Sequence, residues 1–194
     1  MEIIVEGSSS QSFKPDEVIM YFNFSINSKT YEEVLEKGNL SVQLFVDGLN
    51  SLGLDVKTDN FTIMEDKKYN NETKEYDFIG YIYNQNSNLV FDYNVNLINK
   101  IMKNLSNLNY VPTYSFDFRL KDENKYRDMV LDSCYEDALK QASSIALKFN
   151  KELKECLKAD FKFYNNNIRL TNYSEVINPV VNINGVLYTT WETK

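Results

Sequence analysis

Between Val18 and Asn27 apolar and polar residues alternate, and this pattern constrains the fold more than any other in the chain. One face of the segment is entirely apolar, and it consists of Val18, Met20, Phe22, Phe24 and Ile26. A period of two with one apolar face is typical of a β-strand in a sheet that is covered on one side only. Pro15 stands just before the segment, where its missing N–H costs no ladder hydrogen bond. The sequence therefore predicts a sheet with helices packed on one of its faces.

Three segments have the period of an α-helix. The first begins at a capping box formed by Thr30 and Glu33 and ends before Gly53, and a short one follows near residues 97–108. The longest spans about residues 122–149 and ends at Asn150, a residue type that tolerates a left-handed stop. Its apolar stripe consists of Tyr126, Met129, Val130, Ser133, Ala138, Ala142, Ile145, Ala146 and Phe149. The alanines indicate that the helix backbone lies close to the sheet.

The remaining segments are expected to be strands and turns. Strands are expected at 2–5, 114–120, 157–163 and 186–191, with a two-stranded ribbon at 56–69 and 76–91. Gly80 inside the ribbon indicates a bulge or a close crossing, and the serines at 8–12 are expected to form a flexible turn. Helices interrupt strands that pair as antiparallel hairpins, so the predicted class is α+β. The prediction is an antiparallel-rich sheet with helices mainly on one face and a C-terminal tail strand.

Three stretches, taken in order and at this spacing, resemble the SIMPL-domain family. They are IIVEG at 3–7 followed by PDEV at 15–18, GYIYNQ at 80–85, and DALKQASSIALKFN at 137–150. The resemblance runs over roughly residues 2–164, which implies one SIMPL-like domain at 1–164 and a tail at 165–194 whose final strand packs on the same domain. The family is a mostly bacterial group of poorly defined biochemistry. The resemblance therefore implies a general link to the cell envelope and stress tolerance, or, as in the animal relatives, to signalling adaptors.

The chain contains no histidine. Its absence removes the commonest general base at neutral pH. It also makes Ser-His-Asp and Cys-His arrangements impossible here. The two cysteines, Cys134 and Cys156, are too few for a structural zinc site. Cys134 is expected beside the buried stripe of the longest helix, as a small apolar residue of the core. The sequence leaves open whether the two thiols ever pair. We therefore expect a protein that is not an enzyme and that carries no cofactor and no metal.

Three carboxylates, Asp128, Asp132 and Glu136, lie four residues apart on one face of the longest helix. Like charges at this spacing repel one another, and the favoured interpretation is a solvated acidic face. The alternative is a cation site in a hydrolase that depends on a divalent cation. A third hypothesis, a small-ligand carrier with its pocket between the long helix and the sheet, is disfavoured because the alanines leave little room there.

Charge and hydropathy argue against nucleic acid as a partner and against a membrane-spanning helix. The net charge of −7 argues against nucleic acid, because affinity for phosphates comes largely from Lys and Arg. No apolar stretch approaches the roughly 20 residues that a membrane-spanning helix needs. Met1 leads directly into a strand-like segment without a basic and apolar leader, so we expect a cytoplasmic protein. The alternative is an exported protein whose leader has been removed, since many bacterial relatives are exported.

The candidate interaction surface consists of aromatic residues on strands. Tyr69 and Tyr76 flank the tip of the ribbon, and Tyr188 and Trp191 lie on the tail strand. Exposed strand edges pair readily with another chain, and tyrosine suits both sheet faces and interfaces. The tail strand is equally able to close its own sheet. The sequence therefore favours a binding or assembly protein that forms a homo-oligomer through sheet edges or binds a protein partner.

Overall fold

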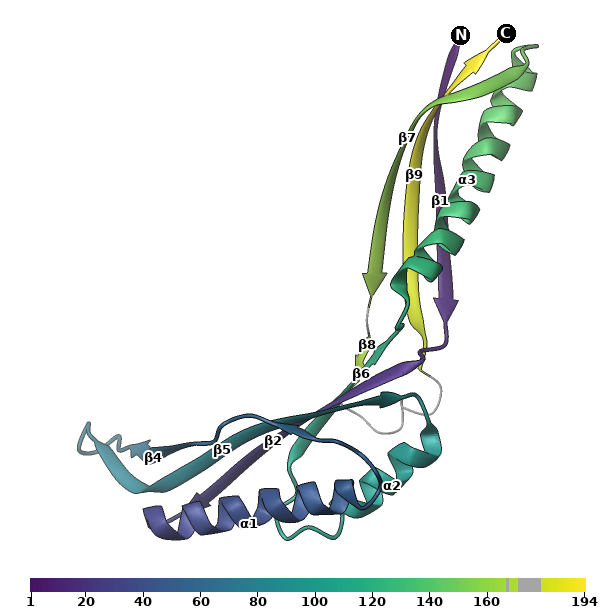
Figure 1. Ribbon diagram of the computed structural model, residues 1–194. Helices are drawn as coiled ribbons and strands as arrows, with labels where there is room; N and C mark the ends of the chain where they lie inside the picture. The colour runs from purple at the N-terminus through teal and green to yellow at the C-terminus, as the bar shows by residue number, and fades with distance from the viewer. Residues whose placement is uncertain (167, 171–178) are drawn as a thin grey trace. The chain divides into compact units, whose positions relative to one another are not determined.

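The computed structural model describes residues 1–166, 168–170 and 179–194. Within these residues the chain forms nine strands and three helices, in two separate sheets (Figure 1). The chain divides into two compact units. The central unit consists mainly of Glu17–Asp117, and the terminal unit contains Met1–Asp16 together with the longest helix and the strands Leu153–Asn166 and Val181–Thr193. The predicted α+β class with antiparallel pairing and a C-terminal strand is confirmed.

The central unit is built on a six-stranded sheet with the order β3-β5-β2-β6-β8, in which β4 also pairs with β5. Its strands are β2 (Glu17–Ser28), β3 (Lys57–Thr58), β4 (Thr62–Tyr69), β5 (Tyr76–Asp92), β6 (Thr113–Arg119) and β8 (Ile168–Leu170). Strands β2 and β5 pair antiparallel from Glu17 opposite Asp92 to Ser28 opposite Tyr81. Helix α1 (Tyr31–Asn50) packs against β2 and β5, and α2 (Val95–Leu105) contacts α1.

The alternating segment in β2 behaves as predicted, because its apolar face is the core of the central unit. Phe22 and Phe24 are 2% and 1% exposed. Phe45 of α1 lies between them, with ring centroids 4.7 Å from Phe22 and 5.2 Å from Phe24 and both pairs edge-on. Such aromatic pairs add about 0.5–1.5 kcal/mol each beyond the burial of their area. Helix α1 begins at the predicted cap, where the side chain of Thr30 accepts from the N–H of Glu33.

The predicted ribbon is the β4–β5 pair, and Gly80 has both of the roles that its position indicates. The register shifts between Asp66 and Lys67, opposite Gly80 and Phe78, so the ribbon contains a bulge there. A Cβ atom on Gly80 would also collide with the carbonyl oxygen of Ser28. A side chain at this position would therefore push β5 away from the end of β2.

The terminal unit has a three-stranded sheet with the order β1-β9-β7. Its strands are β1 (Glu2–Phe13), β7 (Leu153–Asn166) and β9 (Val181–Thr193), and its helix is α3 (Glu123–Lys148). Strand β9 is the middle strand and pairs antiparallel with both neighbours. The tail strand thus closes its own sheet, and at its end the N–H of Thr193 donates to the carbonyl oxygen of Met1 over 3.0 Å.

The expectation of a flexible turn at residues 8–12 is wrong. These serines form the second half of β1, with Ser8 opposite Val186 and Ser12 opposite Asn182. Strand β9 supplies a continuous row of backbone partners, and this pairing outweighs the weak strand preference of the residues themselves. Local sequence could not show it, because the partner strand lies at the other end of the chain.

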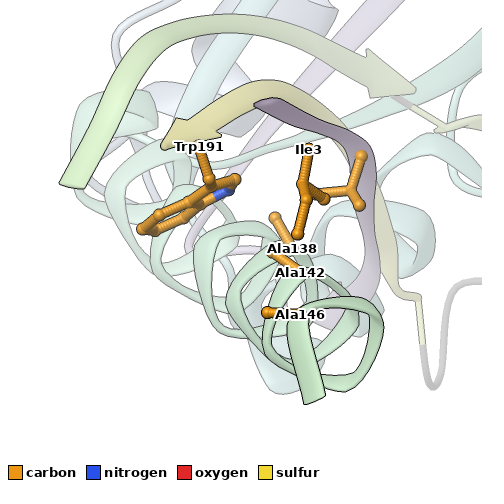
Figure 2. Packing of buried hydrophobic residues seen from close by; sticks show 6 residues of the cluster. Ile3, Ala138, Ala142, Ala146 and Trp191 are labelled. Atoms are coloured by element: carbon orange, nitrogen blue, oxygen red, sulfur yellow. The ribbon is translucent and has the colours of Figure 1, made fainter. Parts of the chain in front are cut away.

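Helix α3 lies very close to its sheet, as the alanines predict. Ala138 and Ala142 are fully buried, and they face Ile3 of β1 and Trp191 of β9 (Figure 2). A Cβ atom on Gly7 would collide with the carbonyl oxygen of Cys134 in the helix backbone. Gly7 therefore sets the distance between β1 and α3.

The buried stripe of α3 is narrower than predicted. It is a single row with a spacing of four residues, made of Val130, Cys134, Ala138, Ala142 and Ala146. Met129 and Phe149, expected in the stripe, are 44% and 63% exposed. The reason is that α3 packs mainly on β1 and β9 and touches β7 much less. One helix therefore covers only part of the sheet face.

Candidate functional site

The two outer edges of the terminal sheet differ in how their backbone groups are satisfied. Along β1, the N–H of Ser8 donates to Oδ2 of Asp137 on α3 over 3.0 Å. The side-chain amide of Gln141 donates to the carbonyl oxygen of Glu6 and to Oδ2 of Asp137, both over 2.9 Å. Side chains of α3 thus occupy edge groups of β1 that another strand would otherwise use.

A third side chain ties the same strand to the helix further along. The amide of Gln11 donates to Oγ of Ser133 over 2.7 Å and to the carbonyl oxygen of Met129 over 3.4 Å. Strand β1 is therefore held against α3 over much of its length. Pairing of this edge with another chain would require these contacts to break.

The opposite edge of the sheet is the outer side of β7. This strand has 14 residues and pairs with β9 on one side. Among the described residues no strand pairs with its other side. The register with β9 is irregular between Leu153 and Lys158 and regular from Lys158 onward. Leu157 of this strand is 50% exposed, so apolar surface is accessible there.

Charges alternate along the regular part of β7. Asp160 stands opposite Tyr188 of β9, and the ammonium group of Lys162 lies 5.3 Å from the centroid of the Tyr188 ring. Because successive residues of a strand point to opposite faces, Tyr188 lies on the face away from the buried Leu187 and Trp191. Asp160 and Lys162 therefore belong to the open face of the terminal sheet.

The two predicted contact residues of the tail strand have different positions. Tyr188 is 40% exposed on the open face. Trp191 is 3% exposed, and its indole N–H donates to Oγ1 of Thr189 over 2.8 Å. Its ring lies 5.8 Å from that of Tyr135. The expectation that Trp191 offers an exposed surface is corrected, because β9 is the middle strand and this face lies under α3.

At the tip of the ribbon, Tyr69 and Tyr76 stand directly opposite each other on β4 and β5. Their ring centroids are 5.2 Å apart, and the side chains are 45% and 68% exposed. The structure thus brings this predicted pair together at the surface. A role in contacting a partner stays a prediction.

The acidic ladder lies on the outside of α3. Asp128, Asp132 and Glu136 are all exposed. In the part of the chain that the structure describes, no group of three or more His, Cys, Asp or Glu side chains is arranged to hold a metal ion. The neighbouring Asp137, which sequence reasoning did not single out, is the carboxylate that contacts the sheet. The available signal was its place at the start of DALKQ, in one of the three stretches that carry the family resemblance.

The two cysteines are free thiols in the described structure. Cys134 is buried in the stripe of α3, as expected, and Cys156 is half-buried at the start of β7. Burial, and to a lesser degree the nearby Asp137, raise the pKa of the Cys134 thiol. Because the thiolate is the reactive form, Cys134 is held in an inert state.

A pocket of about 460 Å³ in the central unit was not anticipated from the sequence. It lies over β2, β5 and β6, and the residues that line it are Tyr21, Phe22, Asn23, Asp59, Asn86, Ser87, Asn88, Thr113, Tyr114 and Ser115. Sequence reasoning considered only a pocket beside the long helix. The signal was the run of asparagines in β5, at 84, 86 and 88, which is unusual for a strand.

Comparison with known families gives one assignment. The chain belongs to the SIMPL family, described as a protein of unknown function (DUF541), whose profile matches residues 3–178. No curated protein matches the chain. Among the described helices none is both long and apolar enough to cross a membrane.

Proposed function

With SIMPL-family membership as the premise, we propose that this chain is a non-enzymatic assembly protein whose copies join through the free edge of β7. The observation that carries the proposal is the difference between the two edges of the terminal sheet. Side chains of α3 hold β1, whereas the outer side of β7 has no strand beside it in the described structure. A strand edge with unpaired N–H and C=O groups is a template for a further strand.

The sequence of β7 favours a second copy of the same strand as its partner. If two β7 strands pair antiparallel with Phe161 opposite itself, Asp160 of each copy faces Lys162 of the other. The same register places Ala159 opposite Phe163. All of these residues lie in the regular part of β7, beyond the irregularities near Cys156. Opposite charges across an antiparallel pair stabilise it by roughly 0.2–1 kcal/mol each.

This arrangement has twofold symmetry, so both copies use the same surface and the assembly closes as a dimer. Two three-stranded sheets would join into one continuous sheet. The edges that remain at its two ends are the β1 strands, which α3 already holds. The proposal therefore accounts for both edges of the terminal sheet.

The test is a charge exchange measured by size-exclusion chromatography with light scattering over a range of concentrations. The wild-type protein is expected to form a dimer. Asp160→Lys places lysines opposite each other twice and is expected to weaken the dimer about tenfold. The double variant Asp160→Lys/Lys162→Asp restores opposite charges and is expected to restore the dimer.

The matched control is Asp160→Lys/Lys158→Asp, which has the same composition of charges but leaves the two lysines facing each other. It is expected to remain as weak as the single variant. A wild-type chain that stays monomeric at high concentration would contradict the assembly itself. Rescue by the control rather than by the Lys162 variant would contradict the register.

One broader part of the proposal comes from family resemblance alone, namely a stress- or envelope-related role. Growth of a deletion strain under envelope and oxidative stress checks it.

A further inference from the structure

The asparagines of the central sheet are poorly explained by the fold. Asn86 and Asn88 lie in the interior of β5, which has β2 on one side and β3 and β4 on the other. Asparagine is disfavoured in strands, because its side chain competes for backbone hydrogen bonds and packs little apolar surface. A residue type that is unfavourable in its secondary structure and adds no packing in return is typical of a functional site.

Cross-strand pairing gathers these amides into one place. Asn86 stands opposite Asn23 of β2, and Asn88 stands opposite Tyr21. The amide nitrogen of Asn23 donates to Oδ1 of Asn86 over 2.8 Å. By strand alternation these side chains lie on the face away from Phe22 and the aromatic core. They form part of the wall of the 460 Å³ pocket.

The wall has the chemistry of a hydroxyl-binding site. An amide side chain offers two N–H donors and one carbonyl acceptor, and the Asn23–Asn86 bond uses only one donor and one acceptor site. The pair therefore presents donors and acceptors side by side, as a ligand hydroxyl requires, because a hydroxyl both donates and accepts. Thr113 and Ser115 add hydroxyl groups, and Tyr21 and Tyr114 add aromatic surface.

Charge narrows the class of ligand. Asp59 is the one charged residue among those that line the described pocket, and no Lys or Arg is among them. An anionic ligand would find no positive partner there, whereas a carboxylate accepts strong hydrogen bonds from hydroxyl groups. The backbone of Asp59 is fixed on both sides, since its N–H donates to the carbonyl of Asn86 and its carbonyl accepts from Gln85.

We propose that this amide-lined pocket binds a neutral, polyhydroxylated ligand of the saccharide class. Its volume lies within the range of pockets that hold small ligands, about 300–1,000 Å³. Amide and hydroxyl groups select the ring hydroxyls, Asp59 fixes one side of the ligand, and the tyrosines cover its less polar surface. The site lies within the central unit and does not depend on the proposed assembly of β7.

The experiment uses the full chain and a panel of neutral oligosaccharides, namely maltotriose, cellotriose and chitotriose, with inorganic phosphate and glucuronate as anionic probes. Saturation-transfer NMR detects binding and isothermal titration calorimetry measures it. At least one neutral probe is expected to bind saturably, and the two anions at least tenfold more weakly. Absence of binding by every neutral probe at millimolar concentration would overturn the proposal, and so would equal binding of phosphate.

Two variants locate the site on the pocket. Asn86→Thr removes the amide but keeps a residue that strands favour, so the fold is retained, and binding of the neutral probe is expected to fall at least tenfold. The control is Asn84→Ala, two residues away on the same strand and the same face, outside the residues that line the pocket. Binding to the control is expected to change less than twofold. An equal loss in both variants would overturn the assignment to this pocket.

Discussion

The two units of this chain hold a helix against a sheet in opposite ways. In the central unit, large rings fill the space, with Phe45 of α1 between Phe22 and Phe24 of β2. In the terminal unit, small residues remove the space, since Gly7 lies against the backbone of α3 and Ala138 and Ala142 face the sheet. The first core depends on large side chains that fill the space between helix and sheet. The second depends on small residues that let the helix and the sheet lie close together. Opposite changes of volume should therefore destabilise the two units, namely loss of volume in the central unit and gain of volume in the terminal unit.

The largest expected effect is the loss of volume in the central core. Phe45→Ala leaves a cavity between Phe22 and Phe24 and is expected to lower the free energy of unfolding by about 3–5 kcal/mol. Urea denaturation followed by circular dichroism measures the loss. Trp191 is the single tryptophan and lies in the terminal core, so its fluorescence reports on the other unit in the same experiment. A stability unchanged within about 1 kcal/mol would contradict the role of Phe45.

The corresponding test of the terminal core adds volume. Gly7→Ala brings a methyl group into the backbone of α3 at Cys134 and is expected to cost about 1–3 kcal/mol, as overpacking does. Fluorescence of Trp191 during denaturation measures it. The matched control is Gly48→Ala in α1, where the added atom meets the flexible side chain of Asn104. The control lies in the central unit and is followed by circular dichroism. It is expected to be neutral or stabilising, since alanine is a better helix former than glycine.

A smaller effect is expected from the one polar contact described inside the terminal core. Thr189→Val keeps the shape of the side chain but removes the acceptor of the Trp191 indole N–H. An unsatisfied buried donor costs about 1–3 kcal/mol, and we expect the lower end because neither the indole nor the hydroxyl group is charged. Thermal unfolding followed by fluorescence measures it. Thr190→Val, the neighbour on the open face, serves as the control.

The smallest effect on stability concerns the two edges of the terminal sheet. Asp137→Ala releases the N–H of Ser8 and is expected to cost about 0.5–1.5 kcal/mol, the net value of one hydrogen bond. The released edge should also associate with other chains, so light scattering is expected to show species larger than a dimer. Asp132→Ala, an exposed carboxylate on the same helix, should leave both measurements unchanged. Equal behaviour of the two variants would contradict the role of Asp137.

The sequence was sufficient for features that depend on neighbours in the chain. The alternation in β2, the cap at Thr30 and the left-handed stop at Asn150 all follow from local periodicity and backbone preference. The close approach of α3 to its sheet also follows, because a buried stripe of alanines has no large side chains to hold the helix away from the sheet.

Features that depend on distant partners did not follow from the sequence. The serines at 8–12 form a strand only because β9 lies beside them, and Trp191 is buried only because β9 is the middle strand. The contact between Asp137 and the edge of β1 likewise needs the three-dimensional structure. The asparagines of β5 were visible as a short polar run, but only the pairing with Asn23 makes them a site.

The pairing of β1 with β9 has a consequence for how the chain reaches this structure during synthesis. The residues of the central unit are nearly continuous in sequence, so this unit can form as it leaves the ribosome, whereas β1 leaves first and must wait for β9. During that interval the apolar side of β1, with Ile3 and Val5, has no strand to shelter it. Molecular chaperones are therefore expected to act on β1 of a nascent copy until β9 has been synthesised.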